Sequence, residues 1–226
     1  MIFHEERNYL FVHIQKTGGT SISAHLTGHF DARFVSPAHL PLRCLAFEGP
    51  KPFIFAAVRN PWERLVSWYE MMRAKGVHND FSRYLLQAGG DGQAPGFSDF
   101  IRRTAVISES TKPETVWSRC RGVIYDETQG YQKSLSFNQV DYLTDPSGRM
   151  ICDRFVMFSG LAEGMAALTR VLHPDRVPLT LPHLNVRSSP THWRAYYQSG
   201  DDREWVARLY RKDLNHFGFS FETDVK

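Results

Sequence analysis

Phe11-Val12-His13-Ile14-Gln15-Lys16-Thr17-Gly18-Gly19-Thr20-Ser21 is the part of the chain that predicts its architecture most directly. Residues 9–14 are nearly all apolar or aromatic, which is typical of a strand buried on both faces of a parallel sheet. The two glycines let the backbone expose its N–H groups, and Thr20 and Ser21 offer N-cap and hydroxyl chemistry for a following helix. The positive end of that helix, with the Lys16 ammonium beside it, would face an anion. We therefore predict a nucleotide-phosphate site at this turn.

The obvious comparison is the P-loop of ATP- and GTP-using enzymes, Gly-x-x-x-x-Gly-Lys-Ser/Thr. Here the lysine precedes the glycines, so the chain does not carry that pattern. A glycine pair by itself also fits an ordinary β-to-α turn with a solvated lysine. The complete run favours phosphate binding, because each of its positions has a separate reason to bind phosphate.

Residues 13–21 closely resemble the 5′-phosphosulfate loop of the carbohydrate sulfotransferases, the family that includes the heparan sulfate 2-O- and 6-O-sulfotransferases and their bacterial relatives. Those proteins usually have proline where this chain has Gln15, a change that affects loop stiffness more than phosphate contacts. The resemblance implies 3′-phosphoadenosine 5′-phosphosulfate (PAPS) as donor and 3′,5′-bisphosphoadenosine (PAP) as product. It places the 5′-phosphosulfate on Lys16, Thr17, Gly18, Gly19, Thr20 and Ser21.

A second buried strand is predicted for residues 52–58, with a helix over residues 61–75 directly after it. Asn60 is a good N-cap, Pro61 suits the first helical position, and Glu63 can close a capping box. Apolar residues at helical spacing give the helix a side that faces the core. They are Trp62, Leu65, Val66, Tyr69 and Met72.

Arg59 is expected at the carboxyl end of this second strand, where open α/β sheets bind ligands. Ser67 lies off the apolar stripe of the helix, so the two side chains could clamp a phosphate. From the residues alone, an arginine that caps local carbonyls and a solvated serine fit equally well. Residues 58–69, however, closely resemble the family's 3′-phosphate segment, in which an arginine at the strand end and a serine eight residues later hold the 3′-phosphate of PAPS.

The predicted fold class is α/β, with a P-loop-like central parallel sheet flanked by helices on both faces, as in the sulfotransferase fold. We expect residues 1–226 to form a single sulfotransferase domain. Residues 181–189 look like the late segment that folds over the nucleotide in these enzymes, and Arg187 could add a phosphate contact, although a surface turn fits as well. Further strands are predicted over residues 33–35, 139–144 and 155–158, and further helices over residues 97–106, 161–172, 193–197 and 204–217.

Sulfuryl transfer needs stabilisation of the departing bisphosphate and a base for the acceptor hydroxyl. We assign the first role to Lys16 and the loop N–H groups, and the second to His39, because some relatives place their catalytic histidine in this interval. A solvated loop histidine is the alternative, and His29 is the reserve candidate. The transferred group carries less charge than a phosphoryl group, so we expect no metal ion.

Composition sets the remaining expectations. The net charge is only +3, so we expect no nucleic-acid partner. The resemblance to the carbohydrate sulfotransferases implies a carbohydrate or glycolipid as acceptor. Three scattered cysteines, Cys44, Cys120 and Cys152, fit a reducing compartment. Without an apolar run that could be a signal peptide or cross a bilayer, we expect a soluble cytoplasmic protein of the bacterial kind. A kinase-like P-loop protein that uses ATP and Mg²⁺, and a non-enzymatic polyanion-binding module, are the alternatives.

Overall fold

The computed structural model describes residues 1–35, 38–47, 49–77, 80–87, 96–110, 134–177, 180–182, 184 and 191–222. Contacts divide the chain into two units. Among the described residues, the first unit contains those within 1–59 and 139–184, and we call it the sheet unit. The second contains those within 60–110, 134–138 and 191–222, and we call it the helical unit. That residues 1–226 form one domain stays a prediction.

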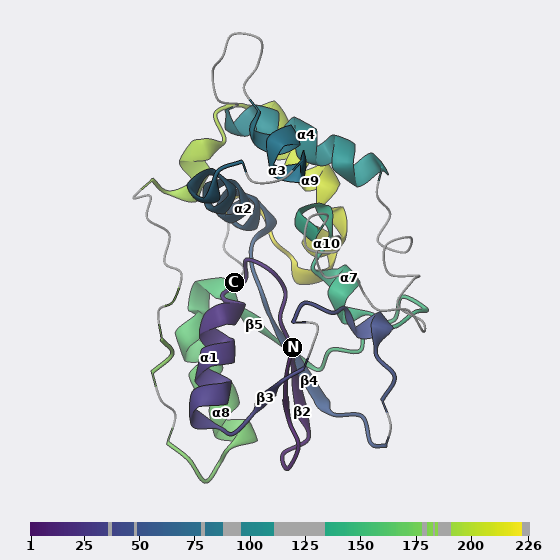
Figure 1. The fold of residues 1–226 in the computed structure, drawn as a ribbon, viewed down its shortest axis with the longest axis vertical. Coiled ribbons are helices and arrows are strands. Elements are labelled where there is room, and N and C mark those ends of the chain that lie inside the picture. The colour runs from purple at the N-terminus through teal and green to yellow at the C-terminus, as the bar shows by residue number, and fades with distance from the viewer. Residues whose placement is uncertain are drawn as a thin grey trace. The chain divides into compact units, whose positions relative to one another are not determined.

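One mixed sheet of five strands lies at the centre of the sheet unit (Figure 1). Strands β2, β4 and β5 run parallel, as predicted, whereas β1 pairs antiparallel with both β2 and β3. The sheet is therefore parallel only in its middle and at its β5 edge. In spatial order the strands are β3 (Arg33–Phe34), β1 (Ile2–His4), β2 (Tyr9–Val12), β4 (Phe53–Val58) and β5 (Arg154–Met157).

Strand β1 was not expected from the sequence. It joins β2 through a tight turn whose last residue, Asn8, has a φ of 46°. Asparagine tolerates this left-handed conformation better than most residues, and the turn can therefore bring Phe3 opposite Leu10. The short β1 strand depends on this pairing, since three residues are too few to show a pattern.

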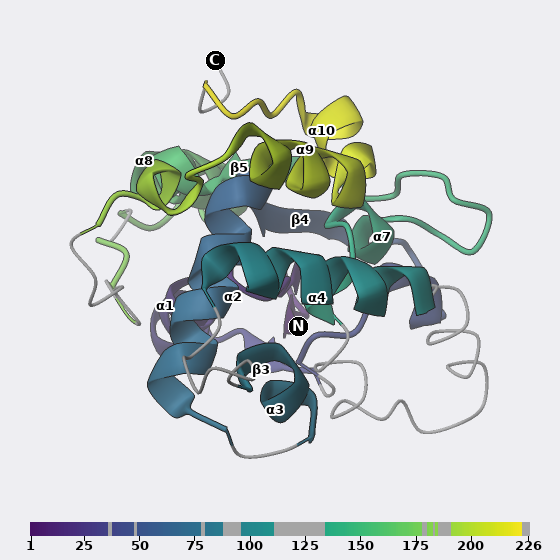
Figure 2. The same cartoon turned by 90° about the horizontal axis from the view of Figure 1, so that it is seen from above.

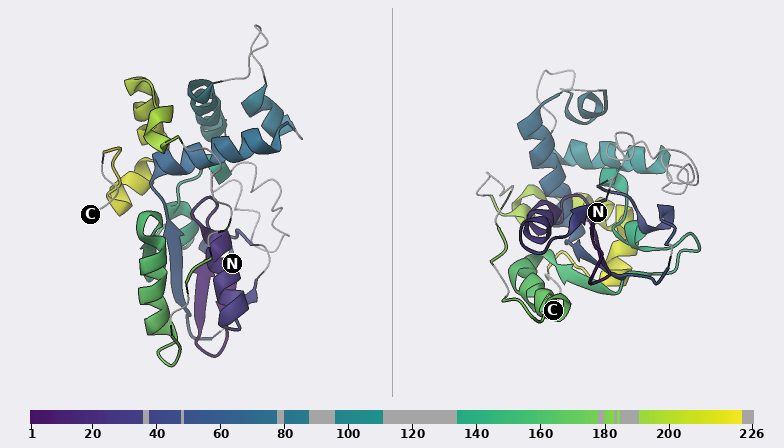
Figure 3. Two further views of the ribbon diagram at one scale, coloured as in Figure 1. Left: turned by 90° about the vertical axis from the view of Figure 1, so that its left-hand side faces the viewer. Right: turned by 60° about the horizontal axis from the view of Figure 1, so that its bottom comes forward.

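Helices α1 (Gly19–His29) and α8 (Leu161–Leu172) pack on one face of the sheet. The purple α1 and the green α8 run alongside the strands in Figure 3. In Figure 1, the short helices η1 (Leu42–Cys44) and α7 (Val140–Leu143) lie on the other side of the sheet. All four residues of β2 are buried, as expected of a strand covered on both faces. The core on the α1 and α8 face includes Tyr9, Phe11, Phe55, Val156, Ile22, Leu26, Met165 and Leu168.

Two local predictions for the sheet unit were wrong. Residues 139–144, predicted as a strand, contain helix α7, because a single helical turn is too short to show a period of 3.6 residues. Neither Thr20 nor Ser21 is the N-cap of α1, which is Gly18 with a φ of 84°. The prediction for α8 over residues 161–172 is confirmed to the residue.

The helical unit begins with α2 (Pro61–Lys75), whose predicted bounds are confirmed. The Asn60 side chain accepts a hydrogen bond from the Trp62 N–H at 3.1 Å, so the predicted cap is confirmed as well. All five residues of the predicted apolar stripe of α2 are buried. Its other described elements are α3 (Asp80–Leu86), α4 (Phe97–Ser110), η3 (Ser134–Ser136), η5 (Trp193–Tyr196), α9 (Gly200–Leu209) and α10 (Arg211–Phe217).

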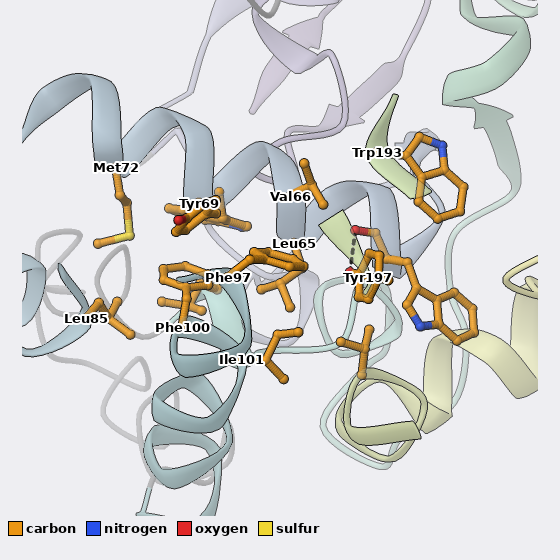
Figure 4. Packing of buried hydrophobic residues seen from close by; sticks show 14 of the residues in the cluster. Leu65, Val66, Tyr69, Met72, Leu85, Phe97, Phe100, Ile101, Trp193 and Tyr197 are labelled. Atoms are coloured by element: carbon orange, nitrogen blue, oxygen red, sulfur yellow. Dashed lines mark hydrogen bonds between the residues drawn. The ribbon is translucent and has the colours of Figure 1, made fainter. Parts of the chain in front are cut away.

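An aromatic core holds the helical unit together (Figure 4). Tyr69 of α2 packs against Phe97 and Phe100 of α4, with both ring centroids 5.1 Å away. The Tyr197 hydroxyl donates a hydrogen bond to the main-chain oxygen of Trp62 at 2.8 Å. Figure 2 shows α4 between α3 and α9, which both contact it. This core fixes the helix that carries Ser67.

Candidate functional site

The turn between β2 and α1 is held in a defined backbone conformation. Lys16 has a φ of 67° and Gly18 a φ of 84°, so two of its residues are left-handed. The buried Thr17 hydroxyl donates a hydrogen bond to the main-chain oxygen of Ile14 at 2.9 Å. A left-handed lysine is uncommon and is retained only where its surroundings require it. Its half-buried side chain thus starts from a position that the turn fixes.

Both glycines of the turn are needed for close packing. A Cβ atom on Gly18 would lie 2.6 Å from Leu161 Cδ2 and 3.3 Å from the Phe158 ring. A Cβ atom on Gly19 would lie 2.0 Å from Cδ2 of His13. The pair therefore lets an aromatic ring and an imidazole approach the turn from two directions.

The N-terminus of α1 is suited to an anion. Its N-cap residue, Gly18, supplies no side-chain cap, and its first turn contains no acidic residue. The first N–H groups of a helix lack partners within the helix and carry its partial positive charge. The Ser21 hydroxyl accepts a hydrogen bond from the N–H of Leu184 at 3.1 Å, so the late segment reaches the start of α1.

Arg59 and the turn meet, as expected for the carboxyl ends of neighbouring parallel strands. Nη1 of Arg59 donates a hydrogen bond to the main-chain oxygen of Lys16 at 3.1 Å. The guanidinium carbon lies 3.8 Å from the centroid of the Phe158 ring. Arg59 is only 9% exposed, so its charge acts in surroundings where electrostatic interactions are stronger than in water. The carboxyl ends of β2 and β4 thus bring together the Arg59 guanidinium, Lys16 and the N-terminus of α1.

Gln139 fixes the backbone of Arg59. Its Oε1 accepts a hydrogen bond from the Arg59 N–H at 2.8 Å, and its Nε2 donates one to the Arg59 main-chain oxygen at 2.8 Å. Sequence reasoning missed this residue, since nothing local marks a glutamine that acts on a strand far away in the chain. It also missed Phe158, although its place after a parallel strand was a usable signal.

His39 lies against His13. Its Nδ1 donates a hydrogen bond to the main-chain oxygen of His13 at 2.8 Å, because a carbonyl can only accept. The two ring centroids are 4.4 Å apart. In its neutral form, His39 therefore keeps its lone pair on Nε2, and this nitrogen can accept a proton. Since the His13 ring also packs over Gly19, His39 is brought to the turn.

His13 itself is a neutral side chain. Burial, followed by the positive charges of His39 and the amino terminus, lowers the pKa of His13 to about 3. Its Nδ1 lies 3.5 Å from the Ser23 hydroxyl. At physiological pH it therefore packs as an uncharged ring rather than acting as an acid.

Other predicted residues are not part of this group. Ser67 is half-buried on α2 in the helical unit, and its clamp with Arg59 stays a prediction. Arg187 lies outside the described residues. His29 ends α1, about 15 Å along the helix from Gly19, which favours His39 as the base.

The described segments contain neither a metal-binding cluster nor a membrane-spanning helix. In this part of the chain, no group of three or more His, Cys, Asp or Glu side chains could hold a metal ion. None of the helices within the described ranges is long and apolar enough to span a bilayer.

A protein-family model matches most of the chain. The model of a protein family described as the sulfotransferase family matches residues 1–220. No curated protein and no solved structure matches significantly. The match covers nearly all of the chain, including both segments that meet at the turn.

Proposed function

Because the chain belongs to the sulfotransferase family, we propose that it transfers the sulfuryl group of PAPS to a hydroxyl of a carbohydrate or glycolipid. One observation carries the proposal: Nη1 of Arg59 lies 3.1 Å from the main-chain oxygen of Lys16. This contact joins the two segments that resemble the 5′-phosphosulfate and 3′-phosphate sites of one nucleotide. A single PAPS molecule with two anionic ends fits such a pairing.

The positive charge at the turn complements the negative charge of the donor. The N-terminus of α1 and the Lys16 ammonium would hold the 5′-phosphosulfate, with Gly18, Gly19 and Thr20 donating from their N–H groups. Thr17 would contribute mainly through the shape of the turn, since its hydroxyl bonds to the Ile14 oxygen. The Ser21 hydroxyl would add to the 5′-phosphosulfate site. The 3′-phosphate would bind Arg59, with further contacts expected from Ser67 and Arg187.

The proposed reaction is an in-line displacement at sulfur. A bond forms between the acceptor oxygen and sulfur while the bond between sulfur and the 5′-phosphate oxygen breaks. The electron pair of the broken bond moves to that phosphate oxygen, where Lys16 and the N–H groups of the turn stabilise the charge. The acceptor proton passes to Nε2 of His39. The modest charge of the sulfuryl group gives no need for a metal ion.

Calorimetric titration tests the donor. The purified protein is titrated with PAP, ADP and ATP, each with and without Mg²⁺, and so are the Arg59→Ala and Arg170→Ala variants. We expect metal-independent binding of PAP that weakens at least about tenfold in Arg59→Ala, because a charge-assisted bond to phosphate is lost. Arg170 is an exposed residue of α8, and its variant should bind like the unchanged protein.

Two results would contradict the proposal. Binding that ignores the 3′-phosphate would remove the reason to assign PAPS as donor. Preference for ATP with Mg²⁺ would support a kinase-like enzyme instead. The acceptor class is tested separately, by transfer of radiolabelled sulfur from PAPS to oligosaccharides, glycolipids and simple phenols, and transfer to phenols alone would contradict it.

A further inference from the structure

Phe158 touches both halves of the candidate donor site. It follows β5 directly, begins the short helix η4 (Phe158–Gly160), and is half-buried. Its ring centroid lies 3.8 Å from the guanidinium carbon of Arg59. Atoms of the same ring lie 3.3 Å from the position that a Cβ atom on Gly18 would take. A single side chain therefore contacts the arginine and the glycine turn together.

The sheet explains why Phe158 and Arg59 meet. Strands β4 and β5 run parallel, and their last paired residues are Val58 and Met157. Arg59 and Phe158 each follow directly after these residues, so both side chains start from the carboxyl ends of neighbouring parallel strands. At this end of the sheet the guanidinium lies over the ring.

The ring offers Arg59 something that an aliphatic side chain of similar size does not. The face of an aromatic ring carries partial negative charge and attracts a cation within about 6 Å. With Phe158 on one side and the Lys16 oxygen bonded to Nη1, the flexible arginine side chain is restricted before any ligand arrives. Restricting a side chain in its binding conformation increases affinity, because less entropy is lost on binding.

We propose that Phe158 is a positioning residue that holds the Arg59 guanidinium in place for the 3′-phosphate of the donor. This inference rests on the proposed function. If it is correct, Phe158 increases the preference of the protein for nucleotides with a 3′-phosphate over nucleotides without one. A ring that only packs against Gly18 would affect both kinds of nucleotide alike.

A double-mutant cycle separates these roles. PAP and adenosine 5′-phosphate are titrated into the unchanged protein, Phe158→Leu, Phe158→Tyr, Arg59→Ala and the Arg59→Ala/Phe158→Leu double variant. The measured quantity is the dissociation constant of adenosine 5′-phosphate divided by that of PAP. A high ratio means that the 3′-phosphate contributes strongly to binding. Thermal unfolding checks that each variant is folded, and Phe158→Met replaces Phe158→Leu if the latter does not fold.

We expect Phe158→Leu to lower the ratio about tenfold, as loss of a partly buried cation–π contact predicts. Phe158→Tyr keeps the ring and should stay within about twofold of the unchanged protein. In the Arg59→Ala background, Phe158→Leu should change the ratio no further, because the cation it positions is gone.

Three results would overturn the inference. Phe158→Leu could leave a high ratio unchanged, it could weaken the binding of both nucleotides equally, or it could lower the ratio even in the Arg59→Ala background. A ratio near one in the unchanged protein is a different failure. It would refute the proposed donor itself, and the role of Phe158 with it.

Discussion

The side-chain amide of Gln139 pairs with both main-chain polar groups of Arg59, through two hydrogen bonds of 2.8 Å. Gln139 is completely buried. Strands β4 and β5 end their pairing at Val58 and Met157, so Arg59 lies just beyond the paired residues, and the amide bonds its main-chain groups there. The backbone of the proposed 3′-phosphate ligand is thus held by a residue from a distant part of the chain.

We predict that Gln139→Leu destabilises the protein. The change removes both hydrogen bonds in a buried setting, which should cost on the order of 2 kcal/mol in the free energy of unfolding. Urea denaturation measures this loss, with Gln87→Leu as the control, since Gln87 is exposed. PAP binding should weaken as well, because Arg59 is less well placed. Equal stability of the two variants would contradict this role of the amide.

Substitutions at two glycines of the same helix should have opposite effects. A Cβ atom on Gly19 would lie 2.0 Å from His13, so Gly19→Ala must displace the imidazole and, with it, His39. We expect loss of stability and of most sulfotransfer activity. Gly28 lies in α1 with no atom within 4 Å of its Cβ position, so Gly28→Ala should raise stability by up to about 1 kcal/mol.

Thermal unfolding and a transfer assay of both variants check this pair. Because alanine is the better helix former at both positions, the difference between them isolates the contact with His13. A Gly19→Ala protein as active and stable as Gly28→Ala would show that the imidazole can move without consequence.

Acid should destabilise the protein in part through His13. Its pKa is lowered from 6.5 to about 3, first of all by burial. Below about pH 6.5 the unfolded chain therefore binds a proton that the folded protein does not, and the free energy of unfolding falls as the pH falls toward 3. Each pH unit in this range costs up to about 1.4 kcal/mol.

Replacement of the imidazole by a ring that does not titrate tests this prediction. His13→Phe should show a shallower fall of unfolding free energy below pH 6, measured by denaturation at several pH values. A residual slope is expected, since burial also lowers the pKa of His25 and His173. Identical slopes for His13→Phe and the unchanged protein would contradict a protonation cost at His13.

Local contacts explain what the sequence could predict. The cap of α2 joins Asn60 to Trp62, two residues apart, so the pattern of the chain contains the whole interaction. The buried strands and α8 are similar, because the apolar residues that indicate each element lie within the element itself. Strand β1 and helix α7 were missed, since both are too short to show a period and depend on partners elsewhere.

The candidate site divides in the same way. The turn and Arg59 could be predicted, because strand ends and glycines mark ligand sites in α/β sheets. The residues that hold Arg59 could not, since Gln139 and Phe158 lie far from it in the chain and only the sheet brings them together. Likewise, His39 could be chosen by residue type, but its bond to the His13 oxygen depends on the path of the loop.

Replacing His39 should remove the base without removing the loop. In His39→Asn, the side-chain amide can still donate to the His13 oxygen but has no nitrogen that accepts a proton. We expect kcat to fall by about 10²–10⁴-fold, with PAP affinity nearly unchanged. His29→Asn is the matched control, because His29 is exposed at the other end of α1, and it should keep full activity. A His39→Asn enzyme that keeps its kcat would show that the acceptor proton goes elsewhere.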